Sequence, residues 1–97
     1  MSKDYRIEKR NNQIIDIVLI GHTTSHIRLQ QLDDVTYCVI STYVDNAERG
    51  QGLGTKLYKA MLSYIRENKA KFSATCPYIA EIAANDKTVK DIYTERV

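Results

Sequence analysis

The sequence predicts an α/β protein of the α+β kind, with a mainly antiparallel sheet, a central helix, a parallel strand and short C-terminal helices. Before residue 45, apolar and polar residues alternate or β-branched residues cluster, as in strands. From residue 53, apolar residues recur three and four positions apart, as on one face of a helix. The two patterns meet at a glycine-rich stretch, and 97 residues leave room for one domain, residues 1–97.

Four strands are predicted in the first half of the chain. Residues 5–10 alternate weakly and end at a turn of two asparagines, and residues 14–20 form a β-branched run that ends in a turn-prone cluster. Residues 27–30 alternate again and connect through Asp33 and Asp34 to residues 35–44. This last stretch is rich in Val, Ile, Tyr and Thr on both faces, which indicates a strand with neighbours on both sides.

The second half should contain a helix over about residues 52–68 and a short strand at 71–75. Because a strand–helix–strand order favours a right-handed crossover, this strand should lie parallel to residues 35–44. Pro77 suits the first position of a second helix, with Cys76 as its N-cap. Asp86 should then cap a last turn that packs Val89 and Ile92 on the core.

The composition argues against several classes of protein. A net charge of +2, with acids and bases interspersed, is far from the basic excess of a nucleic-acid-binding protein. No apolar run approaches the roughly 20 residues of a membrane span, and the N-terminus does not resemble a signal peptide. We therefore expect a cytoplasmic protein whose two cysteines, Cys38 and Cys76, are free thiols rather than metal ligands.

The glycine-rich stretch, residues 49–56, predicts an anion site. Glycines at alternate positions expose the backbone, and the first N–H groups of a helix attract phosphate through the helix dipole. Two known phosphate motifs do not fit, because the third glycine of a Rossmann loop would fall on Thr55 and the Walker A lysine would need a glycine directly before Lys56. A tight connection that binds nothing is the alternative. The predicted pyrophosphate amides are those of Gly50, Gln51, Gly52, Leu53 and Gly54.

At these residues the sequence resembles the GNAT superfamily of acyl-CoA N-acetyltransferases, whose loop follows the pattern Arg/Gln-x-x-Gly-x-Gly/Ala. The segment Thr75-Cys76-Pro77-Tyr78 is similar to the Cys-Pro-aromatic motif of the superfamily's minimal branch, and the resemblance covers about residues 35–93. One position departs from the pattern. Where this branch carries His-Thr, the chain has Ser41-Thr42, so no role of that histidine carries over.

The resemblance implies a small GNAT-like fold that binds acetyl-CoA between the strands before and after the central helix. It also implies a backbone N–H at Val44 for the reaction's oxyanion, and a tyrosine as proton source, with Tyr78 and Tyr93 as candidates. Asp45 and Glu48 are the acids nearest the expected thioester. The implied cofactor-binding residues are Tyr43, Val44, Arg49, Gly50, Gln51, Gly52, Leu53, Gly54 and Thr55.

Cys76 allows three interpretations. At a helix N-terminus its thiolate form would be favoured, so it could accept the acetyl group and pass it on. It could instead line the pocket and take part in proton transfer, or it could be a small packed residue.

Two functions remain open from the sequence. The leading one is acetyl transfer from acetyl-CoA to an unidentified amine. Because no amphipathic helix is predicted before residue 50, the acceptor side should be open to a small amine or a protein amine, or be completed by an oligomer or another partner. The alternative is a coenzyme A-binding module with little catalysis, acting as a sensor or an assembly subunit.

Overall fold

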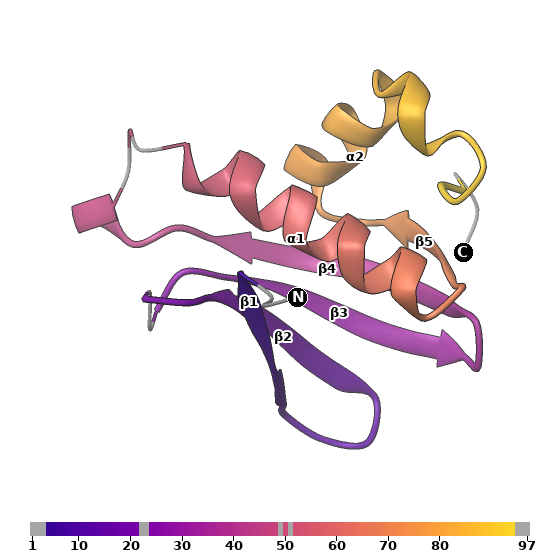
Figure 1. Ribbon diagram of the computed structural model, residues 1–97, viewed down its shortest axis with the longest axis horizontal. Helices are drawn as coiled ribbons and strands as arrows, with labels where there is room; N and C mark the ends of the chain where they lie inside the picture. Colours follow the sequence, from indigo (N-terminus) through magenta and orange to yellow (C-terminus); the bar gives the residue numbers. More distant parts are fainter. Residues whose placement is uncertain (1–3, 22–23, 49, 51, 95–97) are drawn as a thin grey trace.

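The computed structural model describes residues 4–21, 24–48, 50 and 52–94 (Figure 1). The predicted elements of both halves are confirmed, and a short 3-10 turn before the glycine loop is an addition that the sequence did not indicate. In chain order the elements are β1 (Tyr5–Lys9), β2 (Ile14–Leu19), β3 (His26–Asp33), β4 (Thr36–Tyr43), η1 (Asn46–Glu48), α1 (Leu53–Glu67), β5 (Lys71–Ala74), α2 (Pro77–Ala84) and η2 (Lys87–Val89).

The sheet has the strand order β1-β2-β3-β4-β5. The three pairs among β1, β2, β3 and β4 are antiparallel, and β4 pairs with β5 in parallel, as expected for a crossover through α1. In Figure 1, α1 runs along the sheet and α2 lies beside β5. The position of β4 between two neighbours accounts for its apolar residues on both faces.

The core lies between α1, α2 and one face of the sheet. Ile17, Leu29 and Phe72 contribute from three strands and are fully buried, and they belong to the same cluster as Met61 of α1 and Ile79 of α2. Each such side chain contributes about 1.5–3 kcal/mol by leaving water. The helical spacing seen in the sequence therefore marks the buried stripe of α1, which comprises Leu53, Leu57, Tyr58, Ala60, Met61 and Ile65.

The last turn of the chain is tied to α1 through Asp86. Its carboxylate accepts a hydrogen bond from the backbone N–H of Thr88 at 2.9 Å, which confirms it as the cap of η2. The same carboxylate accepts one from the hydroxyl of Tyr58 on α1, also at 2.9 Å. Burial and this contact raise the pKa of the Tyr58 hydroxyl above its usual value, so Tyr58 remains a hydrogen-bond donor.

Asp16 is a buried carboxylate on the sheet face opposite the helices. Its side chain is 0% exposed, and it accepts hydrogen bonds from Nε of Arg28 at 2.8 Å and from Nε of Arg10 at 2.6 Å. Burial alone would raise the pKa of Asp16, but the hydrogen bonds from Arg28 and Arg10 outweigh it and hold the pKa below its ordinary value. The ion pairs of Asp16 with Arg28 and Arg10 therefore join β2 to β3 and to the β1–β2 connection.

A β-bulge bends β4 close to its C-terminal end. Leu29 pairs with Val39 and Arg28 pairs with Ser41, so Ile40 is an extra residue on β4. Such an insertion kinks a strand and increases its local twist. The register of β4 with β5 ends at the pair Val39–Ala74. Beyond that pair, β4 continues past the bulge, while the segment that follows β5 turns away into α2.

Among the described residues, none of the helices is long and apolar enough to cross a membrane.

Candidate active site

A cleft of about 470 Å³ opens where β4 and β5 separate, beside the start of α1. It brings together the end of β4, the glycine loop and the first turn of α2, which are far apart in the sequence. The resemblance to the GNAT superfamily implied a site between the strands before and after the central helix. The lining residues are Thr42, Val44, Gly50, Gly52, Leu53, Gly54, Thr55 and Tyr78.

Two glycines of the loop have the backbone conformation that favours this residue. Gly50 has φ +86° and Gly52 has φ +74°, both in the left-handed region, where a side chain would strain the backbone. Gly52 is also the N-cap of α1, and the hydrogen bonding of that helix begins where the N–H of Lys56 reaches the carbonyl of Gly52. The preceding helical amides, those of Leu53, Gly54 and Thr55, lie in the first turn at the positive end of the dipole.

Gly54 is a glycine for a different reason from the other two. It lies inside α1, and a Cβ added to it would stand 2.9 Å from Cζ of Tyr78 and closer still to the hydroxyl oxygen. Gly54 is thus needed for its contact with Tyr78 and not for a left-handed backbone conformation. The missing side chain of Gly54 lets Tyr78, from α2, reach across to the start of α1 and form one wall of the cleft.

Cys76 is not among the residues that line the cleft and is nearly buried, with 8% exposure. It is the N-cap residue of α2, as predicted, but its side chain makes no capping hydrogen bond. Instead, Sγ donates to Oγ1 of Thr42 at 3.7 Å. Thr42 was not among the predicted site residues. Ser41 pairs with Arg28 and Thr42 pairs with Ile27 on β3, and Thr42 also lines the cleft.

Two of the predicted aromatic residues lie away from the cleft. The ring of Tyr43 packs against His26, with the ring centres 5.7 Å apart, and Tyr43 is not among the lining residues. The ring of Tyr93 packs against Phe72 at 5.1 Å, beside β5. Tyr78 is thus the tyrosine that lines the cleft in the described part of the chain. A backbone contribution from Tyr43 stays a prediction.

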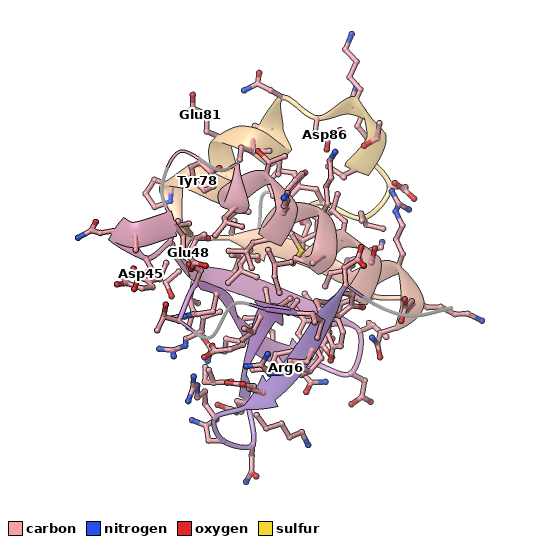
Figure 2. The ribbon with its side chains drawn as sticks, turned by 60° about the vertical axis from the view of Figure 1, so that its left-hand side comes forward. Arg6, Asp45, Glu48, Tyr78, Glu81 and Asp86 are labelled. Carbon is pink, nitrogen blue, oxygen red and sulfur yellow. The ribbon has the colours of Figure 1, made fainter. Side chains whose placement is uncertain are left out.

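Hydrogen bonds fix the side chains of Asp45 and Glu48, which lie between β4 and the glycine loop. Asp45 accepts from the hydroxyl of Thr24 at 3.1 Å and from the N–H of Ala47 at 2.9 Å. Glu48 accepts from the hydroxyl of Ser25 at 2.7 Å, and Ser25 itself is fully buried. Figure 2 shows both carboxylates on the same side of the molecule as Tyr78. Two further predicted residues, Arg49 and Gln51, lie outside the described residues.

A mixed sheet that opens beside a glycine-rich helix start is the N-acetyltransferase type of α+β fold. The sequence pattern of the GCN5-related N-acetyl-transferase family matches residues 18–92, so the chain belongs to this family. The NMR solution structure of a GCN5-like protein from Staphylococcus aureus is similar, with 25% identity and a TM-score of 0.66. That match covers 97% of this chain and 91% of the other. No match was found among curated proteins. The predicted superfamily is thereby confirmed.

Proposed function

We propose that this protein is an acetyl-CoA-dependent N-acetyltransferase that transfers the acetyl group directly to an amine. The observation that carries the proposal is the cleft between β4 and β5, which joins the glycine start of α1 to the end of a bulged strand. Family membership supports the reaction class, and the cleft supplies a place for a thioester.

The residues of the cleft fit coenzyme A. The helical amides of Leu53, Gly54 and Thr55 suit a pyrophosphate, which helix N-termini bind through N–H groups and the dipole. A Cβ at Gly50 or Gly52 would meet nothing within 4 Å, so the backbone there borders open space. We assign the pyrophosphate to this backbone and the pantetheine arm to the end of β4, with Arg49 and Gln51 as further predicted contacts.

Acetyl-CoA would supply the activated acyl group, and the chain would supply the environment for its transfer. As the amine nitrogen bonds to the carbonyl carbon, the carbon–sulfur bond breaks, the amine loses a proton and the sulfur gains one. We assign the backbone N–H of Val44 to the oxyanion and the hydroxyl of Tyr78 to the proton for sulfur, because both residues line the cleft.

Burial of Cys76 favours direct transfer over a relay through its thiol. An acetyl acceptor must be exposed and deprotonated, whereas the Cys76 thiol is nearly buried and donates to Thr42. We assign Cys76 to holding Thr42 at the back of the cleft. Cys76→Ser preserves a donor and should retain kcat within about tenfold, equivalent to 1.4 kcal/mol. Acetylated Cys76 trapped during turnover, together with an inactive serine variant, would contradict direct transfer.

The acceptor is proposed as an accessible amine, either a small molecule or a protein amine. Asp45 and Glu48 lie on the side of the molecule where Tyr78 lines the cleft, so their carboxylates would favour a basic acceptor. The proposed compartment is the cytoplasm, where acetyl-CoA and amines are available together.

A pair of glycine variants tests the cofactor site. Gly21, between β2 and β3, has φ +90° and open space around it, so Gly21→Val carries the same kind of backbone strain as Gly52→Val. Each should lose about 1–2 kcal/mol of folding free energy. Only Gly52→Val should weaken coenzyme A binding, by more than about tenfold, because its side chain would occupy the phosphate position. Calorimetric titration with coenzyme A measures the affinity of both variants.

Equal coenzyme A affinity in the two variants would show that the loop does not bind coenzyme A. Release of thiol from acetyl-CoA with pooled amines then separates the two functions. Turnover supports the transferase, while tight binding without thiol release would point to a coenzyme A-binding module.

A further inference from the structure

The edge of the sheet formed by β1 carries a pattern that the proposed function does not use. β1 is the first strand in the order of the sheet, so its outer side has no neighbouring strand in the described part of the chain. Two hydrogen bonds show which residues at the ends of β1 bond to β2. They run from the N–H of Ile20 to the carbonyl of Asp4 at 2.9 Å and from the N–H of Arg10 to the carbonyl of Ile14 at 2.8 Å.

Antiparallel ladders place such bonds at every second residue. The even-numbered residues of β1 therefore direct their backbone groups toward β2, and residues 5, 7 and 9 direct theirs toward the open edge. The side chains alternate as well. Tyr5 and Ile7 pack with the core, while Arg6 and Glu8 lie on the opposite face and form an ion pair at 2.8 Å.

We propose that two copies of this chain pair antiparallel through β1, about a twofold axis at Ile7, and so form one continuous sheet. In this register Ile7 faces Ile7 of the second copy, and Tyr5 faces Lys9. Because the backbone groups of Ile7 point toward the open edge, the facing pair Ile7–Ile7 can exchange two hydrogen bonds. The half-buried Ile7 side chains would also cover one another.

The charges select this register from its neighbours. With the axis at Ile7, Arg6 of each copy lies opposite Glu8 of the other, at positions between the hydrogen-bonded pairs, where side chains approach most closely. Moving the axis by one residue to Arg6 would set two arginines directly opposite each other. Moving it to Glu8 would set two carboxylates opposite each other. An axis between two residues would pair outward-facing with inward-facing backbone groups.

The pairing is independent of the proposed active site. The cleft lies between β4 and β5, at the other end of the strand order. Figure 2 accordingly shows Arg6 well apart from Tyr78 and Glu48. Dimer formation would leave the cleft open, and loss of the dimer would leave the transferase proposal untouched.

Charge exchange tests the register by sedimentation velocity at concentrations up to about 1 mM. The wild-type chain should dimerise. Arg6→Glu and Glu8→Arg should each weaken self-association at least tenfold, because each places like charges opposite one another. Mixed in equal amounts, the two variants should associate with each other, since residues 6 and 8 of one variant then face opposite charges on the other. Lys59→Glu, an exposed change of the same charge on α1, should dimerise as the wild type does.

A variant that leaves the charges intact provides a second test. Ile7→Pro removes an N–H that points outward and none that the β1–β2 ladder uses, so the chain should fold but remain monomeric. Circular dichroism of every variant verifies folding. A wild-type monomer at all concentrations, a mixture that associates no better than its components, or a dimer of Ile7→Pro would each overturn the proposal.

Discussion

At the scale of single residues, the contact between Gly54 and Tyr78 explains one glycine of the loop by a side chain from another helix. Tyr78 is 46% exposed and the contact is made by the far end of its ring, so the ring could move aside. Gly54 therefore fixes the position of a cleft wall more than it fixes the fold.

Gly54→Ala should displace Tyr78 while leaving folding free energy within about 1 kcal/mol, because alanine favours helix over glycine by a similar amount. The displaced ring should lower kcat/KM by about tenfold. In a Tyr78→Ala background, the same Gly54→Ala change should have little further effect on acetyl-transfer kinetics. If the two losses simply add, Gly54 is needed by the ligand itself and the steric explanation fails.

At the scale of elements, the shape of β4 determines the cleft. Its regular part, up to Val39, lies between two strands, and its last residues follow the bulge at Ile40 and carry Thr42 into the cleft. A second irregularity in the same strand pair leaves Leu32 as the extra residue on β3, near the β3–β4 connection. The two extra residues offer a matched comparison.

Deletion of Ile40 should keep the pairing of β3 with β4, because the facing pairs on either side of the bulge stay the same. The straightened strand should no longer diverge from β5 in the same way, and we expect coenzyme A affinity to fall at least tenfold. Deletion of Leu32 should cost comparable stability without changing affinity. Calorimetry and urea unfolding of both variants give the comparison, and an unchanged affinity without Ile40 would separate the bulge from the site.

At the scale of the whole molecule, the ion pairs of Asp16 with Arg10 and Arg28 link the strands on the face opposite the helices. Arg10 and Arg28 retain 49% and 34% side-chain exposure, so solvent screens part of the attraction. The carboxylate itself is fully buried, and removal of its charge would take away the anion that Arg10 and Arg28 share.

Asp16→Asn should therefore destabilise the fold by about 3 kcal/mol at neutral pH, the lower end for a broken buried pair, because both arginines are partly exposed. Because the folded pKa of Asp16 is lowered, its contribution is fully present above the unfolded pKa of about 3.9 and disappears as pH falls through the folded pKa. Wild type and variant should converge in acid. Urea unfolding between pH 2 and 7 measures this, with exposed Asp34→Asn as the control, and a gap that does not narrow as the pH falls toward 2 would contradict it.

Much of this molecule could be predicted from local sequence patterns. The elements followed from apolar spacing, and the two helix starts followed from the glycines before Leu53 and from Pro77. The glycine loop of the candidate site could be recognised because its backbone parts are consecutive residues, whose conformation depends mainly on their own side chains. Thr42 was missed because a threonine in a strand is common. The only signal near it was Ser41, which stands where the family pattern has a histidine.

By itself, then, the sequence determined the order of the elements, the glycine start of α1 and the N-cap position of Cys76. The tertiary structure alone decided that Tyr78 would need Gly54, that Ile40 would bulge, that Tyr43 would turn toward His26, and that Asp16 would meet two arginines. The physical reason is that periodicity reports which residues share a face, whereas cross-strand register and helix placement decide which faces meet.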